Sequence, residues 1–157
     1  MNNVEYEIVR LQPGRSLPFH LLLLADETVE AIEKYVYTSD VYIVRQKNST
    51  GSIAVFALNK ISNAEVEIKN IAVSESLQGQ GIGNRVMNEI KRIAIANHYK
   101  RIVVGTPDSS LRLIRFYEKN GFIKYDLRKD FFIENYVKPI FEDGIMLRDM
   151  VMLRSSP

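Results

Sequence analysis

The chain has 157 residues, 46% of them hydrophobic and 25% charged, a composition that indicates an ordinary globular domain and excludes disorder, collagen and coiled coil. Its 21 basic and 19 acidic residues leave a net charge of +2, which does not favour nucleic acid as a partner. With no cysteine and only two histidines, a disulfide framework, a thiolate zinc site, a cysteine nucleophile and a multi-histidine metal centre are excluded.

The N-terminal residues give no sign of export or of membrane insertion. Met1 to Glu5 lack the basic and apolar segments of a signal peptide. The apolar stretch from Phe19 to Ala25 is too short to span a bilayer. We therefore expect a cytoplasmic protein with no membrane partner.

The first half of the chain predicts a series of strands. Strands are expected at 4–12, 41–44, 53–58 and 66–73, with one or two short helices between 21 and 36. Pro13-Gly14 ends the first strand, and polar residues 47–52 form the turn between the second and the third. This run is typical of an antiparallel meander joined by short hairpins.

The second half changes to alternating helices and strands. Apolar residues mark one face of a long helix between 82 and 94, and strands at 101–105 and 122–127 flank a helix at 111–119. Asn120-Gly121 predicts a left-handed cap at the end of that second helix. Such a series requires at least one parallel pair of strands. The predicted fold class is α+β, a mixed and mostly antiparallel sheet with helices on both faces, in one domain over 1–157.

The C-terminal tail is the least regular part of the sequence. Residues 129–143 are rich in aromatic side chains and contain Pro139, which predicts a loop or lid beside the last strands. Residues 146–153 predict a closing strand. We expect the aromatic residues of this tail to lie in the core or in an oligomer contact rather than to form a wall that binds the acceptor.

A glycine-rich motif, Gln78-Gly79-Gln80-Gly81-Ile82-Gly83, lies between the fourth strand and the long helix. Glycines let the backbone approach a ligand closely, and a helix N-terminus attracts phosphate. The nucleotide P-loop needs Lys and then Ser or Thr after its last glycine, whereas Asn84-Arg85 follow here. A dinucleotide site needs the motif after the first strand, and here four strands precede it. The motif fits neither nucleotide pattern well, and the alternatives are a site for another phosphate ligand and a tight turn with close helix–sheet packing.

At this point the sequence resembles the GNAT superfamily of acyl-CoA-dependent N-acyltransferases. The resemblance rests on the glycine motif at the start of one helix and on Phe116–Phe122 at the end of the next. It covers about 41–127, and the tail is similar to that of a little-studied bacterial group in the superfamily. A central sheet splayed at its fourth and fifth strands is implied.

The resemblance implies acetyl-CoA as cosubstrate, without a metal. Backbone amides of the glycine loop would hold the CoA pyrophosphate, and the backbone of the preceding strand would pair with the pantetheine arm. Ser110 stands where the family often has an Asn that touches pantetheine. Tyr117 corresponds to the general acid beside the thioester sulfur. The implied cofactor-binding residues are Ile71, Ala72, Val73, Gln78, Gly79, Gln80, Gly81, Ile82, Gly83, Asn84 and Ser110.

The chemistry of thioester aminolysis suggests two more roles. An amine with a pKa near 10.4 costs about 4 kcal/mol to deprotonate at neutral pH, and a carboxylate can take that proton. Glu67, eleven residues before Gln78, is the candidate base, and Glu65 shares its strand face. The backbone N–H of Val73 is the candidate donor to the thioester carbonyl oxygen. These residues predict direct acetyl transfer to a primary amine.

Two alternatives to this function remain at the level of sequence. The same fold could serve as a non-catalytic CoA-binding sensor or assembly subunit, or the glycine motif could belong to a dinucleotide-dependent enzyme. The acceptor could be a small-molecule amine or a peptide amine, because either supplies the nucleophile. A homodimer is compatible with this fold.

Overall fold

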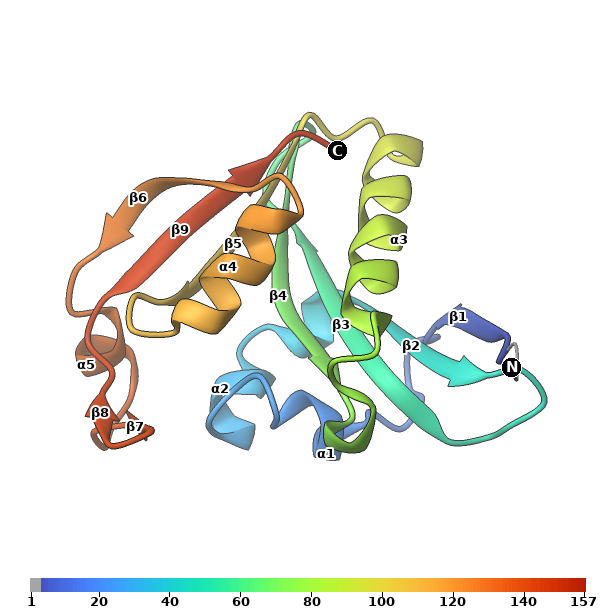
Figure 1. Ribbon diagram of the computed structural model, residues 1–157, viewed down its shortest axis with the longest axis horizontal. Helices are drawn as coiled ribbons and strands as arrows, with labels where there is room; N and C mark the ends of the chain where they lie inside the picture. Colours follow the sequence, from blue (N-terminus) through green and yellow to red (C-terminus); the bar gives the residue numbers. More distant parts are fainter. Residues whose placement is uncertain (1–3) are drawn as a thin grey trace. The chain divides into compact units, whose positions relative to one another are not determined.

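The computed structural model describes residues 4–157, so the first three residues used in the signal-peptide prediction lie outside its described part. Seven strands form one sheet in the order β1–β2–β3–β4–β5–β9–β6, and β7 and β8 form a separate two-stranded sheet (Figure 1). The strands are β1 (Tyr6–Arg10), β2 (Asp40–Gln46), β3 (Ser52–Lys60), β4 (Glu65–Val73), β5 (Arg101–Pro107), β6 (Ile123–Arg128), β7 (Phe141–Glu142), β8 (Ile145–Met146) and β9 (Met150–Ser155). The helices are α1 (Phe19–Leu22), α2 (Val29–Glu33), α3 (Ile82–Ala96), α4 (Leu111–Lys119) and α5 (Phe131–Asn135), with short 3₁₀ turns η1 (Val36–Thr38) and η2 (Glu75–Leu77).

The strand order confirms the predicted meander and the mixed sheet. β1, β2 and β3 pair antiparallel in sequence order, and Tyr42 on β2 stacks on its cross-strand partner Phe56 with ring centroids 4.7 Å apart. β4 and β5 are neighbouring parallel strands with α3 between them in the chain. The fold class is therefore α+β, as the sequence predicts.

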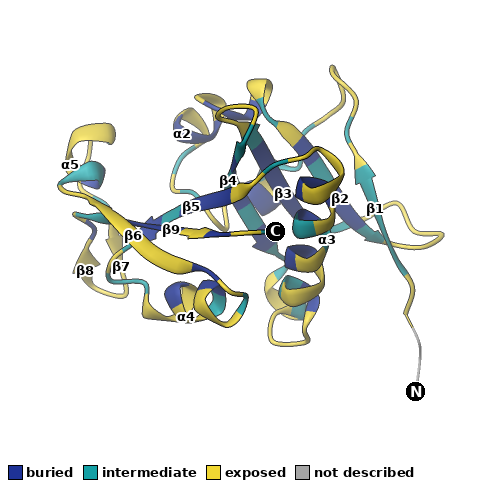
Figure 2. Ribbon diagram, turned by 90° about the horizontal axis from the view of Figure 1, so that it is seen from above, coloured by how far each residue is buried: buried dark blue, intermediate teal, exposed yellow. Residues whose placement is uncertain are grey.

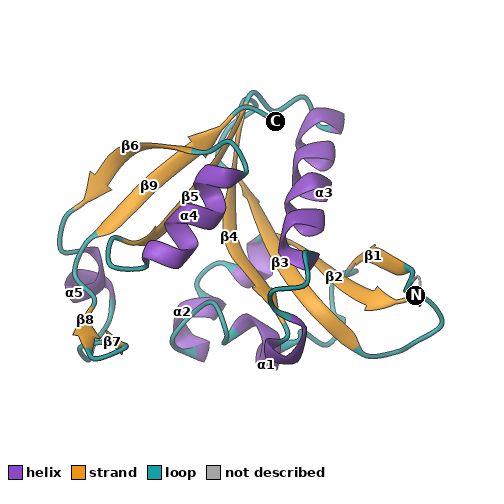
Figure 3. Cartoon of the chain, viewed as in Figure 1, coloured by secondary structure: helices purple, strands orange, loops and turns teal. Residues whose placement is uncertain are grey.

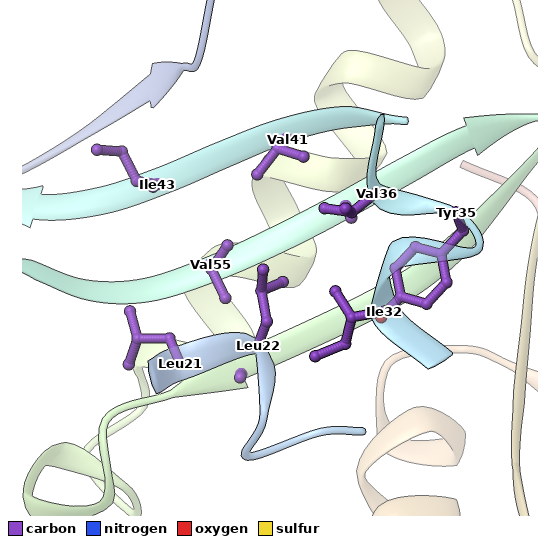
Figure 4. Packing of buried hydrophobic residues seen from close by; sticks show 10 residues of the cluster. Leu21, Leu22, Ile32, Tyr35, Val36, Val41, Ile43 and Val55 are labelled. Carbon is purple, nitrogen blue, oxygen red and sulfur yellow. The ribbon is translucent and has the colours of Figure 1, made fainter. Parts of the chain in front are cut away.

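The chain divides into two compact units, of which the first comprises residues 4–60 and 68–89 among those described. Its core lies where α1 and α2 cover the strands. Leu21 and Leu22 of α1 pack with Ile32 of α2, with Val41 of β2 and with Val55 of β3 (Figure 4). The N-terminus of α2 is capped, because the hydroxyl of its N-cap residue Thr28 accepts a hydrogen bond from the Ala31 N–H at 3.1 Å.

The second unit comprises residues 61–67 and 90–157. Here β9 pairs antiparallel with β5 on one side and with β6 on the other. Every residue of β6 is exposed, as its colour in Figure 2 shows, because β6 is the edge strand of the sheet. The cap predicted at Asn120-Gly121 is confirmed, since Gly121 has a φ of +91°.

α3 has the predicted apolar face. Ile82, Val86, Ile90, Ile93 and Ala94 are all buried, at the spacing of one side of a helix. Figure 3 shows the loop that leads from β4 through η2 into the first turn of this helix. Because Ile82 is buried at the first helical position, the glycines before it are held at the helix start.

The tail differs from the expected loop. It contains the short helix α5 and the β7–β8 hairpin, and the closing strand begins at Met150 rather than at Met146. Asp143 and Gly144 both have positive φ, 51° and 78°, which is the two-residue turn that an Asp-Gly pair favours in a hairpin. Phe132 is buried and stacks on Tyr136 with ring centroids 5.8 Å apart. Among the described residues, no helix is both long and apolar enough to cross a membrane.

Candidate active site

In the glycine loop between η2 and α3, no side chain covers the backbone at the glycines. Gly79 and Gly81 have φ of +78° and +83°, in the left-handed region that side chains disfavour. A Cβ built on either residue would meet no heavy atom within 4 Å. The backbone here is therefore open to close approach by a ligand.

The loop is fastened to the end of β4. The side-chain Nε2 of Gln78 donates a hydrogen bond to the carbonyl oxygen of Val73 at 2.9 Å. Gln78, Gly79, Gln80 and Gly81 are all exposed, while Ile82 is buried beneath them. The first unit thus joins two predicted cofactor elements, the glycine loop and the end of β4, through one side-chain hydrogen bond.

The start of α3 is suited to an anion. The N–H of Arg85 donates to the carbonyl oxygen of Gly81 at 3.2 Å, so helical hydrogen bonding begins there. N–H groups of the residues before it point out of the helix start, where the helix dipole adds roughly half a positive charge. The Arg85 guanidinium lies over the Tyr6 ring, 5.1 Å from its centroid. The residues present fit a pyrophosphate bound mainly by backbone amides.

The three residues of β4 assigned to pantetheine differ in burial. Ala72 is 6% exposed and belongs to the core beneath α1 and α2, whereas Ile71 and Val73 are half-buried. This alternation is that of a strand with one face in the core. The backbone of these residues is the part that the prediction uses, and it lies directly before the glycine loop.

The two candidate carboxylates lie in different surroundings. Glu65 is held by Arg101, whose Nε lies 3.0 Å from Glu65 Oε2. Glu67 is half-buried two residues further along β4. Burial, and then the negative charge of Glu65, raise the pKa of Tyr125, and Glu67 adds to that effect. The Arg154 guanidinium of β9 lies 4.8 Å from the centroid of the Tyr125 ring on β6.

Tyr117 is enclosed by aromatic side chains. Its side chain is 4% exposed, and its ring meets the edges of Phe116 and Phe122 at centroid distances of 5.3 and 5.6 Å. Burial raises the pKa of the Tyr117 phenol well above its ordinary value. The phenol therefore carries its proton at neutral pH, as an unperturbed tyrosine also does.

Ser110 has a bonding partner that the sequence does not predict. It is the N-cap residue of α4 but caps no backbone N–H, and its hydroxyl instead donates to Glu142 Oε2 at 3.1 Å. The hydroxyl thereby links the start of α4 to the β7–β8 hairpin. Its predicted contact with pantetheine stays a prediction.

Comparison with known proteins identifies the family. Residues 16–122 match the acetyltransferase (GNAT) family. The chain belongs to this family. It is 36% identical over 135 residues, 86% of each chain, to the uncharacterized N-acetyltransferase YvbK of Bacillus subtilis. A GNAT family acetyltransferase from Elizabethkingia anophelis with acetyl-CoA bound superposes with a TM-score of 0.90 and 37% identity, covering 97% of this chain and 98% of that one.

A second solved structure supports the cosubstrate. A Bacillus subtilis acetyltransferase in complex with CoA has a TM-score of 0.85 and 31% identity, with 98% of this chain and 99% of that chain covered. The chain is thus an acyltransferase of the GNAT family, and these two similar structures hold acetyl-CoA and CoA. Among residues 4–157, no cluster of three or more His, Asp or Glu side chains could hold a metal ion.

Sequence reasoning missed two residues near the predicted GNAT site. Tyr125 lies on an edge strand, and nothing in its sequence neighbourhood indicates that the charges of Glu65 and Glu67 raise its pKa. The position of Asn70 could have been noticed in the sequence. It lies on the buried face of the alternating strand β4, whose other buried residues are Val66, Ile68 and Ala72. A polar residue on an apolar face requires a hydrogen-bonding explanation.

The buried phenol of Tyr117 predicts how the stability of this GNAT protein depends on pH. The pKa of Tyr117 is higher in the folded than in the unfolded chain, so its contribution is fully present below about pH 10 and falls as pH rises further. Above pH 10 we expect Tyr117 to lower the free energy of unfolding by about 1.4 kcal/mol per pH unit. When urea unfolding is measured between pH 9 and 11.5, the free energy of unfolding should fall less steeply with pH in Tyr117→Phe than in wild type. An equally steep fall in wild type and variant would contradict the prediction that Tyr117 causes this loss of stability.

Proposed function

We propose that this GNAT enzyme transfers an acetyl group from acetyl-CoA to a primary amine by direct attack, with residues 1–157 acting as one catalytic domain. The observation that carries the proposal is the glycine loop. Its two left-handed glycines lie beside open space at the start of the 15-residue helix α3. Such a loop offers backbone N–H groups to a pyrophosphate and leaves no side chain in the way.

Binding of the cosubstrate is assigned to the first unit. We assign the pyrophosphate to the backbone of Gln78–Asn84 and the pantetheine arm to the backbone of Ile71–Val73. The bond from Gln78 to the Val73 carbonyl supports this assignment, because it fixes the loop relative to the end of β4. Ser110 is assigned a supporting contact to pantetheine.

Catalysis is assigned to three groups: a backbone N–H, a carboxylate and a phenol. Acetyl-CoA supplies an activated acyl carbonyl and a thiolate leaving group. The N–H of Val73 stabilises negative charge on the carbonyl oxygen, Glu67 removes a proton from the amine, and the Tyr117 phenol protonates the departing sulfur. The Tyr117 phenol carries its proton at neutral pH and so has one to give. The chain has no cysteine, in agreement with a reaction that uses no acyl-cysteine intermediate.

The acceptor is proposed to be a small-molecule or peptide amine. We would incubate the protein with acetyl-CoA and a panel comprising glycinamide, L-lysine amide, spermidine, 2-phenylethylamine and an aminoglycoside. Thiol release and mass spectrometry of the amine would be followed together. Equal amounts of free thiol and N-acetylated amine are expected for at least one acceptor. Binding of acetyl-CoA without amide formation from any of them would favour a CoA-binding sensor.

A further inference from the structure

Ser110 is an N-cap serine that does not cap its helix. An N-cap serine ordinarily accepts a hydrogen bond from a backbone N–H of the first helical turn. Ser110 makes no such bond at the start of α4, and its ψ of 69° lies outside the extended region that a capping residue usually adopts. Its hydroxyl instead donates to Glu142 Oε2 at 3.1 Å. The helix therefore does not use the lone pairs of Ser110 Oγ.

The bond to Glu142 determines how the Ser110 hydroxyl is oriented. An ionised carboxylate only accepts hydrogen bonds, so the hydroxyl proton must be directed toward Oε2. A hydrogen bond to a carboxylate is charge-assisted and stronger than a bond between neutral groups. Because a serine hydroxyl has a single proton, Ser110 Oγ acts as an acceptor toward any further group. A donor that approaches the start of α4 thus meets an oriented acceptor.

Backbone hydrogen bonds hold both partners in place. Two residues before the serine, the N–H of Asp108 donates to the carbonyl oxygen of Asp149 at 3.1 Å. At the base of the β7–β8 hairpin, the N–H of Leu147 donates to the carbonyl oxygen of Ile140 at 2.8 Å, and the Leu147 side chain is buried. All of these residues belong to the second compact unit. The hairpin therefore presents its carboxylate to the serine from an ordered backbone.

The proposed function supplies a ligand for this acceptor. The pantetheine arm of acetyl-CoA carries two amide N–H groups, and an oriented hydroxyl oxygen is a suitable acceptor for one of them. Ser110 stands where the GNAT resemblance places an Asn, whose side chain has a donor and an acceptor at fixed positions. A serine hydroxyl rotates freely unless a neighbour fixes it. Glu142 supplies the orientation that the serine lacks.

We propose that Glu142 is a positioning residue for the cosubstrate, an inference that rests on the pantetheine binding in the proposed function. It holds the Ser110 hydroxyl so that Oγ accepts a hydrogen bond from an amide N–H of pantetheine. Charge repulsion alone predicts the opposite effect, because removing a carboxylate should favour a ligand that carries phosphates. A weaker affinity for CoA after the loss of Glu142 is therefore diagnostic of the positioning role.

Calorimetric titrations with CoA and with adenosine 3′-phosphate 5′-diphosphate, which is CoA without the pantetheine arm, test this role. We expect Glu142→Ala to weaken the affinity for CoA about 3- to 10-fold and to leave that for the nucleotide within about twofold of wild type. Glu142→Gln keeps an acceptor oxygen and should bind CoA like wild type. Glu134→Ala removes another exposed carboxylate of the tail and should change neither affinity.

A double-mutant cycle tests whether Glu142 acts through Ser110. Ser110→Ala should weaken CoA binding as much as Glu142→Ala does, and the double variant should bind no more weakly than either single variant. Ser110→Asn carries its own donor and acceptor, so in the Glu142→Ala background it should restore the affinity for CoA to within about twofold of wild type. Glu142 is exposed and Ser110 half-buried, so we expect all variants to keep the wild-type unfolding midpoint.

The proposal is overturned if Glu142→Ala leaves CoA binding unchanged or strengthens it, or if it weakens both ligands equally. It is also overturned if the effects of Ser110→Ala and Glu142→Ala add, or if Ser110→Asn fails to restore the affinity. These titrations require no acetyl transfer. Binding of CoA by a wild-type protein that acetylates no amine would instead overturn the proposed function.

Discussion

Replacing Tyr117 by Phe is expected to lower kcat about 10²- to 10⁴-fold while the dissociation constant for acetyl-CoA stays within twofold of wild type. The phenol is proposed to give its proton to the departing thiolate, and it carries that proton at neutral pH. The substitution removes one oxygen and keeps the ring between Phe116 and Phe122. The measurement is steady-state thiol release with a saturating amine.

Two controls make the Tyr117 result specific. The unfolding midpoint at neutral pH should be preserved, because the aromatic packing is retained. Phe116→Leu, which changes a neighbouring half-buried ring, should lower kcat only a few-fold. Equal turnover of wild type and Tyr117→Phe would remove Tyr117 from the mechanism.

Replacing Glu67 by Gln is expected to lower kcat/KM for the amine about 10²-fold at neutral pH and much less at pH 10. The proposed base removes a proton that an amine with a pKa near 10.4 still carries at neutral pH. At alkaline pH the amine is already deprotonated and needs the base less. A pH–rate profile from 6 to 10 therefore tests the role more sharply than one rate does.

Glu65→Gln is the matched control for Glu67→Gln. Both carboxylates lie on β4, and Glu65 forms an ion pair with Arg101, whose Nε lies 3.0 Å from Glu65 Oε2. We expect Glu65→Gln to stay within about fivefold of wild type across the pH range. A larger loss in Glu65→Gln than in Glu67→Gln would assign the base to Glu65.

The regular parts of the fold were predictable because their patterns are local. Alternation in residues 66–73 and helical spacing from Ile82 to Ala94 each follow from one buried face, and both are confirmed. The Asp143-Gly144 turn was equally readable, yet the aromatic and proline content of the tail favoured a loop. α5 escaped prediction for a different reason. It is a five-residue helix, and the Asp130 N–H at its N-terminus is held by Asp149 Oδ1 at 2.8 Å, a contact between residues far apart in sequence.

In the candidate site, too, local features were predictable and contacts between distant segments were not. The glycine loop was predictable, since left-handed glycines before a helix have few structural alternatives. The hydrogen bond between Ser110 and Glu142 and the effect of Glu65 on the pKa of Tyr125 depend on segments far apart in the sequence. No periodicity encodes such contacts. Asn70 stands between these cases, because its position was visible in the sequence and its hydrogen bonds to Leu22 and Tyr35 were not.

Calorimetric titration with acetyl-CoA, for wild-type protein and for Gly81→Glu side by side, tests the central claim most directly. The account predicts micromolar binding to wild type. It also predicts at least a 100-fold weaker affinity for Gly81→Glu, because the variant places a negative side chain at a left-handed position beside the proposed pyrophosphate. Gly14→Glu, at an open left-handed glycine in the turn after β1, controls for backbone strain and should bind like wild type. Equal binding by wild type and Gly81→Glu, or none by folded wild-type protein, would contradict the account.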